Sequence, residues 1–198
     1  MAAHLAAVFA VLLVMSPVLV HGGPGHDLLE AVRQHPRLTM FYQALVTTEY
    51  SKELSTSVDD KPVTIFAPVD EAIQAATADA FPWDCLTNTI AGKAALKDTL
   101  KHHVLKGRFY TVYKLTQTNQ VIPADGFPIE VQYDTEKIVI TLDGYAHVIE
   151  PEVILMENAI VHLIDAVLTT ENIYADVLDA CAEAPASAPS SLGFADGL

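Results

Sequence analysis

Basic residues are scarce in this chain of 198 residues, where 11 Lys and Arg stand against 25 Asp and Glu. The net charge is −14, and a protein that binds nucleic acid needs a basic surface, so DNA and RNA are excluded as partners. There are only two cysteines, too few for a disulfide scaffold or a thiolate metal cluster. Apolar residues, by contrast, make up 51% of the chain, which provides for a buried core and excludes global disorder.

The short motifs of common enzyme classes are also missing. The sequence has no Gly-x-Ser-x-Gly, no His-Glu-x-x-His, no phosphate-binding glycine loop and no Cys-x-x-Cys. His102 and His103 are adjacent, and neighbours on a helix point about 100° apart, which makes a poor chelate. We interpret His103 and His162 as buried, hydrogen-bonded residues. The sequence therefore predicts no enzyme, no cofactor and no metal site.

Residues 1–22 are predicted to be a signal peptide and not part of the fold. Leu5–Met15 is an unbroken run of 11 apolar residues, whereas a membrane-spanning helix needs about 17–25. Ser16 and Pro17 break this run, and a small-residue cleavage site ending at Gly22 follows. We expect the mature chain to begin near Gly23 and to be secreted to the extracellular space.

Helical patterns come first in the remaining sequence and strand patterns come later. We expect helices within His26–Tyr50 (two, joined at Pro36), Val69–Ala76 and Gly92–Leu105, the last capped by Gly107. We expect strands at Val63–Phe66, Ile129–Tyr133, Ile138–Leu142, Ala146–Ile149, Val153–Met156 and Ala159–Val167. This order is typical of an α+β domain. Residues 171–198, which become rich in Ala, Pro and Ser, are expected to form a mostly disordered C-terminal extension.

Two features leave alternatives open. Lys93, Lys97 and Lys101 are four residues apart and form one helix stripe, which is either a solvated helix face or a surface for a charged partner. Cys85 and Cys181 invite pairing in an exported protein, yet the sequence does not show whether they approach each other. Both a disulfide and two free thiols remain open.

Three stretches, in this order, resemble the fasciclin domain. Thr64–Ile73 (TIFAPVDEAI) is similar to its first box, Leu100–Tyr110 (LKHHVLKGRFY) to its central Tyr-His segment, and Asn158–Leu168 (NAIVHLIDAVL) to its second box. The resemblance implies one α+β domain over residues 26–170, a seven-stranded β-wedge or sandwich with a layer of short helices. It implies structural roles for eight box residues: Thr64, Phe66, Pro68, Asp70, His103, Asn158, His162 and Asp165. Of these, Asp70 and His103 are expected to support the fold through hydrogen bonds.

The resemblance also directs attention to the segment before the second box. Animal members contact integrins partly through Glu-Pro-Asp-Ile-Met at this place, and Glu150-Pro151-Glu152-Val153-Ile154 is similar, with one extra residue before Asn158. We expect partner contacts at Glu150, Pro151, Glu152 and Ile154, together with the lysine stripe.

Three functions follow from these observations. The first is a non-enzymatic, secreted adhesion or matrix-associated protein whose partner is the extracellular matrix, a cell-surface receptor or a polysaccharide. The second is a soluble carrier of a hydrophobic small molecule such as a carotenoid, since some secreted algal fasciclin proteins resemble this acidic chain and bind carotenoids. Such a carrier requires an apolar groove between the helical layer and the sheet. The third is binding of divalent cations or mineral by the acidic C-terminal half.

Overall fold

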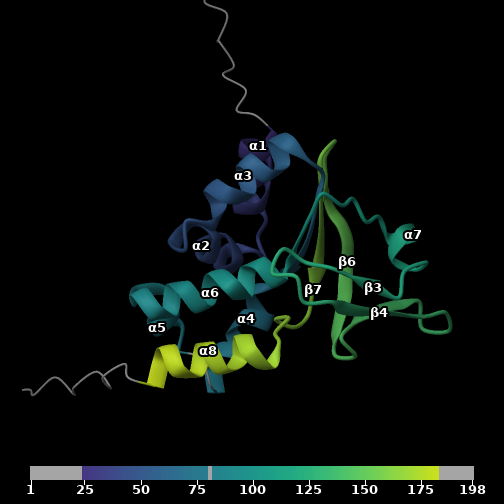
Figure 1. Cartoon of the computed structure of the whole chain (residues 1–198). Coiled ribbons are helices and arrows are strands. Elements are labelled where there is room, and N and C mark those ends of the chain that lie inside the picture. The colour runs from purple at the N-terminus through teal and green to yellow at the C-terminus, as the bar shows by residue number, and fades with distance from the viewer. Residues whose placement is uncertain (1–23, 80–81, 183–198) are drawn as a thin grey trace, which may run out of the picture.

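A layer of helices lies beside a twisted β-sheet in the computed structural model (Figure 1), which describes residues 24–79 and 82–182. The helices are α1 (Pro24–Gln34), α2 (Thr39–Thr47), α3 (Tyr50–Asp60), α4 (Asp70–Asp79), α5 (Trp83–Asn88), α6 (Ile90–His102), α7 (Val112–Leu115) and α8 (Glu171–Ala182). The strands are β1 (Val63–Pro68), β2 (Val104–Lys106), β3 (Gln120–Val121), β4 (Ile129–Asp134), β5 (Val139–Leu142), β6 (Ala146–Leu155) and β7 (Ala159–Ile164). The predicted signal peptide, residues 1–22, lies outside the described residues.

The seven strands form one sheet in the order β2-β1-β7-β6-β5-β4-β3. Strands β1 and β7 are parallel, with Val63 opposite Ala159 and Pro68 opposite Ile164, and the other neighbours are antiparallel. Every residue of β1 and β7 is buried, as is usual for parallel strands covered on both faces. The predicted α+β fold with a seven-stranded sheet and a layer of helices is confirmed.

Strand β1 separates two hydrophobic cores. Ile65 belongs to the core beneath the helices, which also holds Leu28, Leu45 and Leu54. Its neighbour Phe66 belongs to a second core with Leu115, Ile129 and Leu142. Successive residues of a strand point to opposite faces, so this one strand contributes to both cores. Each fully buried Leu or Phe stabilises the fold by about 1.5–3 kcal/mol, which makes β1 a central element of the domain.

The predicted helix at Gly92–Leu105 is too long. Helix α6 ends at His102, and Val104–Lys106 instead form β2, which pairs with the edge of β1 through Val63 and Lys106. Gly107 has a left-handed φ of 71°, but it follows this strand and does not cap a helix. The helical periodicity of the sequence continues through Leu105. The helix nevertheless ends at His102, because the following residues form hydrogen bonds with the edge of β1.

Strand β6 is one long strand where the sequence predicts two. Glu150 pairs with Leu163 and Ile154 pairs with Val161, so β6 advances four residues where β7 advances two. The extra residues form a bulge that accommodates Pro151, which has no N–H to give to a sheet. Within the bulge Glu152 takes a left-handed φ of 57°.

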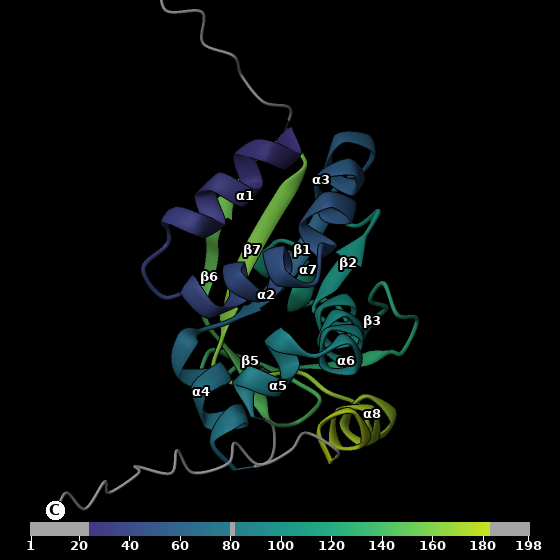
Figure 2. The same ribbon diagram turned by 90° about the vertical axis from the view of Figure 1, so that its left-hand side faces the viewer.

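The expected disorder of residues 171–198 is wrong for the part that the structure describes. Residues 171–182 form α8, which packs against α5 and α6 (Figure 2). Ile173 and Val177, one helical turn apart, are both buried. This apolar spacing is a helical signal in the sequence, whereas the Pro- and Ser-rich composition belongs to the residues that follow α8. Residues 183–198 lie outside the described part of the chain.

Candidate functional site

His103 is fully buried at the end of α6, and both of its ring nitrogens have backbone partners. Its Nδ1 lies 2.8 Å from the carbonyl oxygen of Thr99, which can only accept, so Nδ1 carries the proton. Its Nε2 accepts a hydrogen bond from the N–H of Leu168 at 2.9 Å. Burial, which disfavours the charged ring, lowers the pKa of His103 to about 4. The ring is therefore neutral at pH 7 and joins α6 to the segment after β7.

His162 in β7 is held in the same manner with the opposite tautomer. Its Nε2 donates to the carbonyl oxygen of Tyr110 at 2.8 Å, and its Nδ1 accepts from the N–H of Glu152 at 3.2 Å. Burial lowers the pKa of His162 as well. The ring packs against Phe66 with 5.8 Å between the ring centroids. Both histidines thus use their ring nitrogens to satisfy backbone groups.

Asp70 joins two helices. Its carboxylate accepts hydrogen bonds from the N–H groups of Met40 at 2.8 Å and Thr39 at 3.3 Å, the first residues of α2. The residue before this helix, Leu38, has no side chain able to cap it. Because a helix N-terminus carries partial positive charge, the carboxylate also stabilises α2 electrostatically.

The remaining box residues lie along β1, β7 and their ends. The hydroxyl of Thr64 donates to the carbonyl of Arg108 at 3.0 Å and accepts from the N–H of Tyr110 at 2.9 Å. The carbonyl of Asn158 accepts from the N–H of Val63, and Asp165 binds the N–H and ring Nδ1 of His147. Phe66 is in the second core, and Pro68 ends β1. These contacts hold loops against the central strands.

The segment before the second box does not expose its four candidates together. Glu150 and Pro151 are exposed, and Glu150 forms an ion pair with Arg37 at 2.5 Å. Glu152 is half-buried and accepts a hydrogen bond from the N–H of Val112 at 2.7 Å. Ile154, which was expected to be exposed, is only 8% exposed and belongs to the main core. The bulge in β6 turns Glu152 inward and sets the register that buries Ile154.

The lysine stripe is only half-exposed, and two of its three charges have acidic partners. Lys97 forms an ion pair with Glu53 of α3, and Lys101 forms one with Asp98. Within the described residues Lys93 forms no ion pair. The pairing with Glu53 could not be predicted, because it joins residues 44 positions apart in the sequence.

His102 has a partner 23 residues later in the chain, which no local pattern in the sequence indicates. Its ring is fully buried, and Nδ1 lies 2.7 Å from a carboxylate oxygen of Asp125, whose side chain is 9% exposed. The described residues contain no group of three or more His, Cys, Asp or Glu side chains arranged to hold a metal ion.

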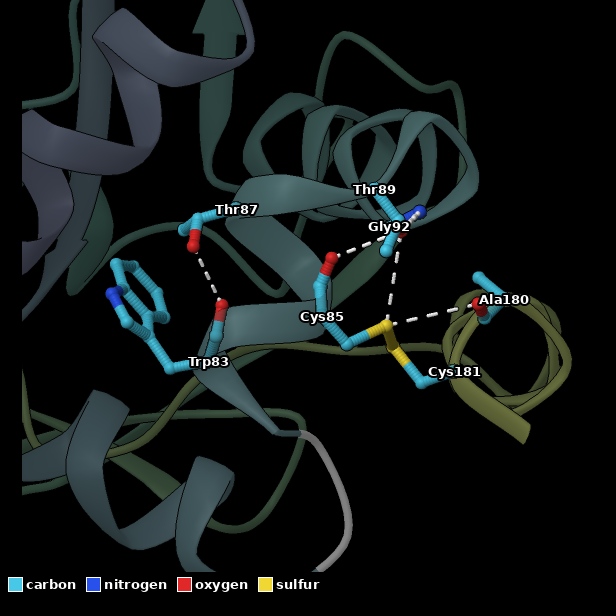
Figure 3. The surroundings of a disulfide bond; sticks show 7 residues. All are labelled: Trp83, Cys85, Thr87, Thr89, Gly92, Ala180 and Cys181. Carbon is cyan, nitrogen blue, oxygen red and sulfur yellow. Dashed lines mark hydrogen bonds between the residues drawn. A yellow bond between two sulfur atoms is a disulfide. The ribbon is translucent and has the colours of Figure 1, made fainter. Parts of the chain in front are cut away.

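An apolar pocket of about 170 Å³ lies among α2, α4, α5, α6 and α8. Two of its walls, α5 and α8, are joined by a disulfide between Cys85 and Cys181, whose Cα atoms are 5.8 Å apart (Figure 3). The sequence left this pairing open, and the structure forms it. The carrier hypothesis required a groove between the helical layer and the sheet, but the pocket lies mainly among helices.

None of the helices in residues 24–79 and 82–182 is long and apolar enough to cross a membrane.

Comparisons with known proteins agree with the fold. The structure is similar to that of a FAS1 domain pair from the insect cell adhesion molecule Fasciclin I, with a TM-score of 0.61 and 20% sequence identity. The similarity covers 74% of this chain and 52% of the other, so this chain spans about half the length of that relative. No curated protein matches the chain. The family model of the fasciclin domain matches residues 36–170, and the chain therefore belongs to the fasciclin domain family.

Proposed function

We propose that this protein is a secreted adhesion or matrix-associated protein that acts through surface contacts of its single fasciclin domain. The observation that carries the proposal is the family match over residues 36–170, since fasciclin domains in general belong to adhesion-related extracellular proteins. His103 and His162 support a non-enzymatic role, because the ring nitrogens of both residues already form hydrogen bonds with backbone groups. The partner is the extracellular matrix, a cell-surface receptor or a polysaccharide.

We place the contact at the outer surface of the β6 bulge. Glu150 and Pro151 are exposed there, and Leu155, which replaces Ile154 as the apolar candidate, is 58% exposed. Arg37 lies beside Glu150 and also reaches Glu71 at 3.5 Å. The bulge surface, defined as Glu150 and Pro151 of the bulge and Leu155 just after it, combines apolar area with paired charges, as protein contact surfaces do. The lysine stripe is a second candidate contact surface. Among the described residues, Lys93 is the one member of the stripe that forms no ion pair.

The test is an attachment assay on immobilised, disulfide-intact mature protein, with folding checked by circular dichroism. The double variant Pro151→Ala/Leu155→Ser should remain folded and lose most attachment. The matched control is Ile90→Ser, which removes an apolar side chain that is 93% exposed on α6, far along the chain from the bulge. Equal attachment of the double variant and the control would overturn the assignment of the bulge surface. Wild-type protein that is folded yet attaches to no cell, matrix preparation or polysaccharide would overturn the adhesive function.

Secretion requires removal of residues 1–22. N-terminal sequencing of the protein collected from the medium should begin near Gly23. A mature protein that begins at Met1 or Ala2 would contradict this part of the proposal.

A further inference from the structure

The apolar pocket is lined by side chains of five helices, together with Pro68 of β1 and with Val167 and Thr169 after β7. Phe41, Leu96 and Ile173 contribute to its apolar wall. Trp83 and Thr77 line it as well and are half-exposed, and Tyr174 is 43% exposed. Because these lining side chains have solvent-exposed surface, the pocket is open to solvent.

Among the residues that the structure describes, no charged side chain lines the pocket, and the polar groups that line it are largely occupied. The hydroxyl of Thr99 donates to the carbonyl of Ala95 at 3.0 Å, and that of Thr77 donates to the carbonyl of Ile73 at 2.9 Å. His103 also lines the pocket, with both ring nitrogens already bonded. A charged or strongly polar group would lose its hydration on entry and gain little in exchange. The pocket is thus selective for uncharged, apolar groups.

The volume limits the size of such a group. An engineered apolar cavity of about 150 Å³ stays free of water and binds benzene. A pocket of about 170 Å³ accordingly holds one ring-sized hydrocarbon group. A longer molecule would leave its remainder outside the pocket.

We propose that this pocket binds an uncharged small molecule through one ring-sized hydrocarbon group. The proposal goes beyond the adhesive function and does not depend on it, because the pocket and the β6 bulge are formed by different elements. The disulfide contributes by holding α8 against α5, so that two walls are in place before the ligand arrives. A pre-organised site loses less entropy on binding than one that must first assemble.

The chain provides its own reporter, because Trp83 is its single tryptophan and lines the pocket. Toluene is titrated into the mature, disulfide-intact protein at pH 7.4, and the indole N–H resonance of Trp83 is followed by NMR. A saturable shift is expected, together with a rise in the urea midpoint, since a ligand that binds only the folded state stabilises it. Benzoate, which has the same ring and a negative charge, should bind at least tenfold more weakly.

A matched pair of variants on α4 tests the location. Ala76 lines the pocket and Ala75 is exposed on the same helix, so Ala76→Phe fills the pocket while Ala75→Phe does not. Toluene binding should be lost in Ala76→Phe and unchanged in Ala75→Phe, and neither variant should alter attachment. No saturable shift in folded wild-type protein would overturn the proposal. Equal binding of benzoate and toluene would do the same even if Ala76→Phe failed to fold.

Discussion

The ring Nε2 of His103 accepts a hydrogen bond from the backbone N–H of Leu168, 65 residues later in the chain, at 2.9 Å. This bond joins the central Tyr-His segment to the end of the second box. Both residues are buried, so without His103 the N–H of Leu168 would have no water molecule as a hydrogen-bond partner. The contact explains why the fold needs an imidazole at this position rather than another apolar side chain.

Replacement of His103 by Ala should destabilise the domain. The change leaves the carbonyl of Thr99 and the N–H of Leu168 without their partner, and a buried unsatisfied polar group costs about 1–3 kcal/mol. Urea unfolding followed by circular dichroism measures the loss. His26→Ala, at an exposed position of α1, is the control and should leave the midpoint unchanged. Equal midpoints for His103→Ala and wild type would contradict the structural role.

The free energy of unfolding should fall on acidification through the histidine range. The pKa of His103 is about 4 in the folded protein against 6.5 for an unperturbed histidine, so the unfolded chain binds more protons between these values. The contribution of His103 to the free energy of unfolding is therefore fully present well above pH 6.5 and is lost as the pH falls towards 4. From pH 8 to pH 5 the expected loss is about 2 kcal/mol from this residue alone.

Urea midpoints at pH 8 and pH 5 test the acid effect, since carboxylates remain ionised over most of this range. His103→Ala should lose a large share of the pH dependence. His162, whose pKa is also lowered by burial, should account for a remainder. A pH dependence that is the same in His103→Ala and wild type would refute the assignment.

Asp70→Ala should destabilise the domain by about 1 kcal/mol, the usual effect of losing a helix N-cap. The reason is that Met40 and Thr39 in α2 lose the acceptor of their N–H groups. Denaturant midpoints report the change, and Asp176→Ala, at an exposed position of α8, is the control. If both variants unfold at the same urea concentration as wild type, α2 does not depend on this cap.

Glu152 should behave as a structural residue and not as a contact residue. Glu152→Ala removes the acceptor of the Val112 N–H and should cost about 1–2 kcal/mol, whereas Glu152→Gln keeps an acceptor oxygen and should cost less. Attachment per folded molecule should be unchanged in both variants. A loss of attachment in folded Glu152→Gln would return this side chain to the contact surface.

Loss of the disulfide should lower the free energy of unfolding by on the order of 4 kcal/mol in the chain-entropy model, because Cys85 and Cys181 close a loop of 96 residues. Oxidised and reduced wild-type protein are compared by urea unfolding, with Cys85→Ser/Cys181→Ser as a variant that cannot respond to reductant. Toluene affinity should fall in the reduced protein as α8 loosens. An unchanged midpoint after verified reduction would show that the bond adds no stability.

Several parts of this protein are determined by local sequence. The hairpin of β4 and β5 follows from alternating residues around a turn at Asp134, and β1 follows from a β-branched and aromatic run that ends at Pro68. The three boxes were enough to identify the family and its seven-stranded fold. These features depend on periodicity and residue type, which are readable without knowing what packs against them.

Other parts were decided only by tertiary structure. Val104–Lys106 form a strand because the edge of β1 is there to pair with them, and Ile154 is buried because the β6 bulge sets its register. The ion pair of Lys97 and Glu53 forms only when the helical layer has assembled. The same holds for the pocket, which is lined by helices from different parts of the chain. Hydrogen-bond partners, strand register and enclosed volume arise between segments far apart in the chain. A local sequence pattern indicates which residues favour burial. Which atoms these residues contact is determined by the segments that pack against them in the folded protein.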